Sequence, residues 1–279
     1  MKYLILTVLF TFSIHLNSQN KAIEFAAINI GLNGIVGGIG SVFHSNQDEK
    51  IGKVILKGFL KGCAAGSVTY TGKLISGNIG KEDDLKYAWP GKITFWIGNS
   101  MMENTALNRP IFEKVNMNFG ILRLEYNFSN KHFDTKLLPL TTVFVGYVAI
   151  NSKFEIEKSL ASGELIFSSN RFNNLEMDFR GFTLGNVVVM NSQFVNNKST
   201  ISHEIIHVFQ NNDFNFVNNW INPSLEKNTF FKKTSKYLYY EFNTIVNQGL
   251  YWTQYKKSDD YYKNIFEREA ATFSDTFRN

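Results

Sequence analysis

The sequence predicts an α+β protein with a glycine-rich helical hairpin, an antiparallel β-rich middle and a helical C-terminal part. Glycines spaced four residues apart near the N-terminus indicate closely packed helices. Segments rich in Val, Ile, Phe and Thr, separated by Asn, Gly and Ser, indicate strands and turns in the middle. After Ser199 this texture gives way to longer helical stretches that continue to the C-terminus.

Composition excludes several classes of protein. Hydrophobic residues make up 44% of the 279 residues and charged residues 19%, so the chain can bury a core and is not a disordered tail. The formal net charge is +5, but the lysines are scattered and form no dense basic run. We therefore predict no nucleic-acid binding, and we assign the basicity to solubility or to contact with an anionic membrane surface.

Residues 1–19 are predicted to be a signal peptide. A basic start at Lys2 precedes an apolar segment, 3–14, and a polar stretch that ends near Ser18 and Gln19, where we expect cleavage. An uncleaved anchor is the alternative, but the apolar segment is short for a membrane span. The single cysteine, Cys63, cannot form an internal disulfide. The protein is thus expected to be exported, to the periplasm, the cell envelope or the extracellular space.

The next part, 20–85, is predicted to be the helical hairpin. Two glycine-rich segments, 26–43 and 51–75, are joined by polar, turn-like residues. Glycines recur at a spacing of four in both segments, at Gly34 and Gly38 and then at Gly58, Gly62 and Gly66. Residues four apart share one helical face, so the glycines leave a flat stripe on which another helix can lie.

Lysines on the second glycine-rich segment bear on membrane contact. Lys53, Lys57 and Lys61 form a basic stripe, which argues against a simple membrane span. A hairpin that lies on a membrane surface through 26–75, or that packs on the rest of the protein, fits this pattern better. A compact soluble hairpin is the remaining alternative.

The remainder, 86–279, is predicted to begin with strands. Leu122, Leu124 and Tyr126 alternate with charged residues, as in a half-buried antiparallel strand. The predicted strands are 119–128, 137–150, 164–168 and 182–194.

The chemistry-bearing motif follows the last of these strands. His203, Glu204 and His207 form a His-Glu-x-x-His sequence, the helical zinc-binding pattern of metallopeptidases. At about 100° per residue, these three side chains and Gln210 fall within one arc of roughly 120°. Apolar residues take the other side, and Ser199 or Thr200 is the expected N-cap.

The spacing suits a tetrahedral metal. Two imidazoles one turn apart can both reach a Zn²⁺ ion at about 2.0–2.1 Å. Glu204 lies beside them on the helix and can accept a proton from a water molecule that attacks a carbonyl carbon.

A third ligand must come from elsewhere, because the residues after His207 provide no third histidine. The C-terminal segment 262–275 offers Glu267 and Glu269. Small side chains at Ala270, Ala271 and Ser274 would let this helix approach the motif helix closely, while Tyr262, Phe266, Phe273 and Phe277 form a core-facing stripe.

These two segments, 199–210 and 262–275, resemble the gluzincin metallopeptidases. The Glu267-x-x-Ala270 arrangement is similar to the third-ligand motif of the prenyl-protein endopeptidases, although Ala271 stands where that family usually has Asp or Asn. The resemblance implies a zincin-like catalytic domain in which His203, His207 and Glu267 bind zinc and Glu204 is the general base. Glu269, followed by Ala270, is the alternative third ligand, as in thermolysin-like enzymes.

The predicted function is therefore a zinc-dependent peptidase that cleaves a protein or peptide substrate in the cell envelope or outside the cell. We expect an extended substrate to pair with 187–194, predicted as an edge strand. The competing hypothesis is a non-enzymatic, envelope-associated binding or structural protein that keeps a metal site or its remnant. A tyrosine that steadies the developing oxyanion is also expected, from Tyr239, Tyr240, Tyr251, Tyr255, Tyr261 and Tyr262.

Overall fold

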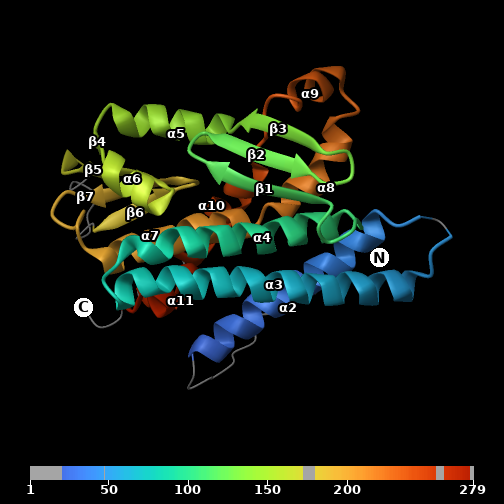
Figure 1. The fold of residues 1–279 in the computed structure, drawn as a ribbon, viewed down its shortest axis with the longest axis horizontal. Helices are drawn as coiled ribbons and strands as arrows, with labels where there is room; N and C mark the ends of the chain where they lie inside the picture. The colour runs from blue at the N-terminus through green and yellow to red at the C-terminus, as the bar shows by residue number, and fades with distance from the viewer. Residues whose placement is uncertain (1–20, 47, 172–179, 256–260, 277–279) are drawn as a thin grey trace.

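The computed structural model describes residues 21–276, apart from 47, 172–179 and 256–260. Its fold class is α+β, as predicted, with helices at both ends of the chain and two sheets between them (Figure 1). The predicted signal peptide, 1–19, lies outside the described residues, as does Phe277 of the predicted core-facing stripe.

The predicted hairpin consists of α2 (Lys21–Phe43) and α3 (Ile51–Lys81). Its glycine stripe lies against α2: a Cβ atom on Gly58 would lie 2.5 Å from the carbonyl oxygen of Gly37, and one on Gly66 would lie 2.6 Å from that of Asn29. A Cβ atom on Gly62 would overlap the carbonyl oxygen of Asn33. Glycine is thus required here because backbone meets backbone.

We expect Gly62→Leu to destabilise the hairpin, since the new side chain must displace the backbone of α2. Overpacking of this kind costs about 1–3 kcal/mol, and an immovable backbone partner favours the upper end. Gly31→Leu is the matched control, because Gly31 is in α2 and a Cβ atom added there would meet nothing within 4 Å. Thermal denaturation and proteolysis of 26–75 measure the effect. Equal melting temperatures for the two variants would contradict it.

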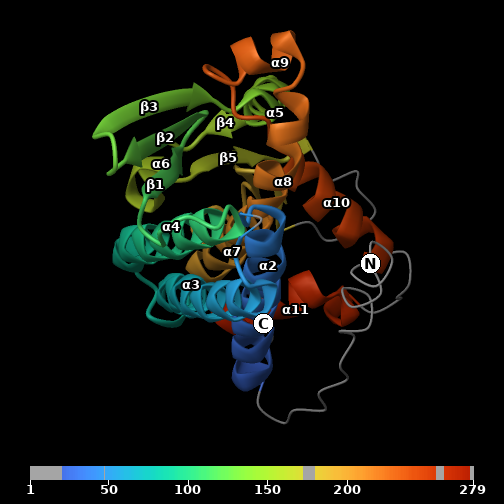
Figure 2. The ribbon, with the colours of Figure 1, turned by 90° about the vertical axis from the view of Figure 1, so that its right-hand side faces the viewer.

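The hairpin packs on the rest of the protein. The second half of α3 lies against α4 (Ala88–Ala106), where a Cβ atom on Gly72 would lie 2.5 Å from the backbone nitrogen of Phe95. Farther along α3, Gly77 faces the carbonyl oxygen of Phe273 near the C-terminus. Figure 2 shows α2 crossing this layer of helices. Of the described helices, α2 is the one long and apolar enough to cross a membrane, with 44% of its most apolar window buried.

Two sheets follow α4. The first is antiparallel, in the order β1 (Lys114–Phe119), β2 (Leu122–Asn127) and β3 (His132–Leu137). The second has the order β4 (Lys153–Phe154), β5 (Leu165–Ser169), β7 (Val187–Asn191) and β6 (Gly181–Leu184). All its pairings are antiparallel except that of β5 with β7. The predicted strands 119–128 and 164–168 are therefore confirmed.

The prediction for 182–194 needs correction, because that segment holds two strands. The chain reverses at Gly185, whose φ of +59° is a conformation that favours glycine, and β6 and β7 pair as a hairpin. Val187–Asn191 is fully buried between β5 and β6. The Gly185-Asn186 pair between the two strands is the turn signal that the prediction overlooked.

The strand predicted at 137–150 is wrong, because Pro139–Ala149 forms helix α5. Pro139 occupies the first turn, where its missing N–H costs no hydrogen bond. Phe144, Val145 and Val148 then pack on the valines of β7, so the helix covers one face of the second sheet. Tertiary packing overrides the β-propensity of its Val, Thr and aromatic residues.

The remaining described helices support the prediction that helical structure continues to the C-terminus. The N-cap of α7 is Asn197, whose Oδ1 accepts a hydrogen bond from the Thr200 N–H at 2.8 Å, so neither Ser199 nor Thr200 has the predicted role. The remaining described helices are η1 (Leu85–Tyr87), α6 (Ile156–Ser162), α7 (Lys198–Asp213), α8 (Phe216–Leu225), α9 (Thr229–Thr234), α10 (Phe242–Tyr255), η3 (Tyr261–Lys263) and α11 (Ile265–Ser274).

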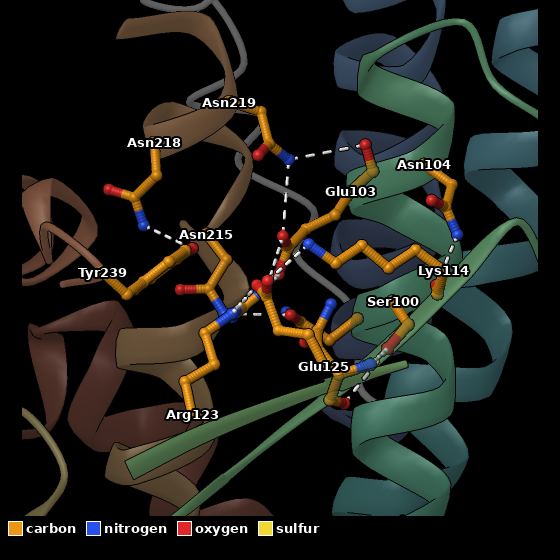
Figure 3. A network of polar contacts seen from close by, with 12 residues as sticks. Ser100, Glu103, Asn104, Lys114, Arg123, Glu125, Asn215, Asn218, Asn219 and Tyr239 are labelled. Atoms are coloured by element: carbon orange, nitrogen blue, oxygen red, sulfur yellow. Dashed lines mark hydrogen bonds and ion pairs between the residues drawn. The ribbon is translucent and has the colours of Figure 1, made fainter. Parts of the chain in front are cut away.

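The buried face of β2 carries charges. Arg123 and Glu125 are 1% and 3% exposed, whereas Leu122 lies on the open face. Figure 3 shows Arg123 between Glu125, at 2.7 Å, and Glu103 of α4, at 2.8 Å, so an ion-pair network joins the first sheet to the helical layer. Burial disfavours the charge of Glu125, but Arg123, Lys114 and Lys136 outweigh burial and hold the pKa of Glu125 well below its usual range. Hydrophobic alternation alone does not reveal such a network.

The main core surrounds α7. Phe209 of α7 stacks on Phe95 of α4, with ring centroids 4.2 Å apart. Ile205 and Ile206 of α7 join the same cluster, together with Val188 of β7. The apolar face of α7 thus packs against both α4 and β7, and this packing fixes the orientation of its polar face.

Candidate metal centre

Three side chains from two helices converge beside α7. His203 Nε2 and His207 Nε2 are 3.1 Å apart, and they lie 3.0 and 3.3 Å from Oε2 of Glu267. The edge of a tetrahedron with 2.0–2.1 Å bonds is about 3.3 Å long, so the three atoms are spaced as ligands of one ion would be. Among the described residues, this trio is the group that could hold a metal ion.

Helix α11 places Glu267 beside the histidines because small side chains on its inner face let it lie close to α7. Asn264 caps the helix by accepting a hydrogen bond from the Phe266 N–H at 3.0 Å, which places Glu267 in the first turn. Ala270 and Ala271 are fully buried. As predicted, small side chains on this face let α11 approach α7 closely.

Hydrogen bonds orient all three candidate ligands. His207 Nδ1 lies 2.7 Å from Oε1 of Gln210, and His203 Nδ1 lies 3.2 Å from the Thr276 hydroxyl. The Tyr251 hydroxyl donates to Oε1 of Glu267 at 2.6 Å. Both Nε2 atoms are thereby directed toward the shared centre. Partners of this kind fix the ring orientation in metal sites.

Glu269, the alternative third ligand, is engaged elsewhere. Its Oε1 accepts from Asn29 at 2.6 Å and pairs with Lys73 at 3.0 Å, and its Oε2 accepts from Gln210 at 2.7 Å. Lys73 is 1% exposed and also pairs with Asp213 at 2.6 Å. A continuous chain of contacts therefore runs from the hairpin through Glu269 and Gln210 to His207.

The electrostatics of the trio match its geometry. Burial disfavours the charge of Glu267, but the two histidines outweigh it and hold the pKa of Glu267 well below its usual range. Burial also opposes protonation of His207, but Glu267 outweighs it and raises the pKa of His207 to about 9. The carboxylate thus concentrates negative charge where a cation would bind.

Glu204 lies on the side of α7 that contacts β6. Its Oε2 accepts a hydrogen bond from the Thr183 hydroxyl at 2.9 Å, and a Cβ atom on Gly181 would lie 2.8 Å from its Oε1. Burial raises the pKa of Glu204, and the nearby histidines oppose this effect. The carboxylate is therefore close to the metal group without belonging to it.

The strand beside Glu204 is not the one expected from the sequence. The segment 187–194 is predicted as an edge, but β7 lies between β5 and β6. Within the described sheet, β6 takes the end position and contacts α7. The edge strand is β6 instead of β7 because the chain forms β6 first, turns at Gly185, and then places β7 in the sheet interior beside β5.

The structure distinguishes among the tyrosines proposed to stabilise an oxyanion. Tyr251 contacts the trio directly, through its hydrogen bond to Glu267. Tyr239 instead stacks on Arg123, and Tyr240 bonds to Thr234. Sequence reasoning also missed Thr183 and Lys73, which reach the site from distant segments and carry no local signal.

Comparison of the chain with family models, with curated proteins and with solved structures finds no match. The resemblance to gluzincins therefore rests on the two short segments 199–210 and 262–275. The functional interpretation rests on the geometry of the site itself.

Proposed function

We propose that this protein is a zinc-dependent peptidase of gluzincin type. The observation that carries the proposal is the convergence of His203, His207 and Glu267 with Glu204 beside them. Two imidazoles and one carboxylate are the protein ligands of many catalytic zinc sites, which leave the fourth position open. His203, His207 and Glu267 would hold the ion.

Zinc, when bound, acts as a Lewis acid and makes water acidic enough to ionise near neutral pH. Glu204 then serves as the general base, which accepts a proton from the attacking water and returns one to the leaving amine. Thr183 holds the carboxylate of Glu204 in place. Tyr251 keeps Glu267 oriented, because its single hydroxyl hydrogen is donated to Oε1 of that carboxylate.

The substrate would be an extended protein or peptide segment. Strand β6 runs past Glu204, since Thr183 donates to that carboxylate and a Cβ atom added to Gly181 would meet it. A peptide aligned along β6 would present its carbonyl groups to the centre by strand addition. The apolar segment 3–14 and the basic start favour export, so the substrate would be met in the cell envelope or outside the cell.

Metal analysis of the purified mature protein tests the proposal. We expect about one zinc per chain, loss of that zinc in His203→Ala, and cleavage of an unfolded protein substrate by the wild type alone. A chelator should abolish cleavage, and added zinc should restore it. Full zinc occupancy in His203→Ala would refute the site. Zinc binding without cleavage would favour the non-enzymatic, envelope-associated binding or structural protein.

A further inference from the structure

The first half of α3 has a continuous apolar surface. Leu56 and Leu60 are 60% and 59% exposed, and Ile55 is 46% exposed. The other side of this segment is occupied by Val54 and Gly58, which are buried against α2. At about 100° per residue, Ile55, Leu56, Phe59 and Leu60 cover an arc of about 140°. The apolar face is therefore too wide to be a chance exposure of one side chain.

Lysines border this apolar arc. Lys53 and Lys57 are exposed and lie one helical turn apart. No Asp or Glu occurs in α3, and no described side chain forms an ion pair with either lysine. Lys61, on the same row, reaches back to the carbonyl oxygen of Arg109 at 2.7 Å. Within the described part of the chain Lys53 and Lys57 thus lack an ion-pair partner, and the nearest acidic residues in sequence, Asp48 and Glu49, precede α3.

We propose that this surface, formed by Ile55, Leu56, Phe59 and Leu60 with Lys53 and Lys57, docks on an anionic phospholipid membrane. An interfacial helix buries its apolar face at the boundary between headgroups and acyl chains while its lysines reach lipid phosphates. The positive charge of Lys53 and Lys57 favours an anionic membrane as the partner of this surface. A second copy of the chain, related by twofold symmetry, would present the same surface, which carries lysines and no acidic side chain of α3 to pair with them.

The position of the docking surface leaves the metal centre free. It lies in the half of α3 next to the hairpin turn, whereas α11 contacts α3 at Gly77 (Figure 1). The helix rises about 1.5 Å per residue, so Gly58 and Gly77 are about 28 Å apart along α3. Docking would therefore hold the protein at the membrane surface without covering the candidate metal centre, and it does not depend on the proposed peptidase activity.

Vesicle co-sedimentation of the mature full-length protein tests the proposal. We expect binding to vesicles of phosphatidylcholine with phosphatidylglycerol, weaker binding to phosphatidylcholine alone, and weakening by salt. Each lysine near an anionic surface contributes about fivefold to affinity, so Lys53→Gln/Lys57→Gln should reduce binding about 25-fold. Leu56→Ser/Leu60→Ser should also reduce binding, by about tenfold for each side chain.

Val143→Ser/Ile150→Ser is the matched control. Both side chains are apolar and exposed, at 64% and 78%, but they lie on and just after α5. We expect this variant to bind as the wild type does. Equal binding by all four proteins, binding without preference for anionic lipid, or no binding at all would overturn the proposal. A dimer that only the leucine variant disrupts would also overturn it, in favour of a second copy. Unchanged circular dichroism and metal content would show that each variant folds.

Discussion

Replacing Glu204 with Gln is expected to lower peptide hydrolysis by about 10²–10⁴-fold while zinc stays bound, because the change removes a general base and no ligand. The amide is similar in size to the carboxylate and can still accept the hydrogen bond from Thr183, so the local structure should persist. Zinc content and single-turnover cleavage, measured on the same preparation, separate the two properties. An unchanged cleavage rate would eliminate the enzyme hypothesis.

Glu267→Gln is the informative comparison. Its Oε2 is 3.0 Å from His203 Nε2, so loss of its charge should weaken the metal site itself. Zinc and activity should then fall together, and added zinc should restore part of the activity. If Glu267→Gln were silent and Glu269→Gln lost the metal, the third-ligand assignment would be wrong. If neither variant lost metal, the third ligand would lie elsewhere.

Lys73→Met is expected to reduce both stability and zinc affinity. Lys73 is the cation between Asp213 and Glu269, and its removal leaves two carboxylates in the interior without a cation. Breaking such a buried pair costs about 3–5 kcal/mol of unfolding free energy. Glu269 would no longer be held by Lys73, so its hydrogen bond from Gln210, which orients His207, would weaken. The loss of such an outer contact lowers metal affinity about 10–100-fold.

Lys92→Met is the control for Lys73→Met. Lys92 is equally buried and pairs with Glu164 at 3.0 Å, but it contacts none of the metal group. We expect a comparable loss of stability with zinc affinity retained. Denaturant unfolding and competition with a zinc chelator, at a temperature where both variants are folded, measure the two effects. Equal zinc affinity for the two variants would show that Lys73 acts only on the fold.

Local patterns were sufficient for several parts of this protein. The spacing of Gly58, Gly62 and Gly66 defines a helical face, and the same face receives the backbone of α2 in the structure. The spacing of His203 and His207 places two imidazoles one turn apart, and their Nε2 atoms are 3.1 Å apart. In both cases the helical repeat converts sequence separation directly into distance.

The amino-acid sequence by itself determined the hairpin, the motif helix and the presence of a carboxylate helix near the C-terminus. The tertiary structure decided which carboxylate meets the histidines: Glu267 and Glu269 are two residues apart, and the rotation of α11 against α7 directs one to His203 and the other to Lys73. It also made 139–149 a helix and turned Arg123 inward. The physical reason is that burial and ion pairing depend on neighbours distant in sequence, which local periodicity does not encode.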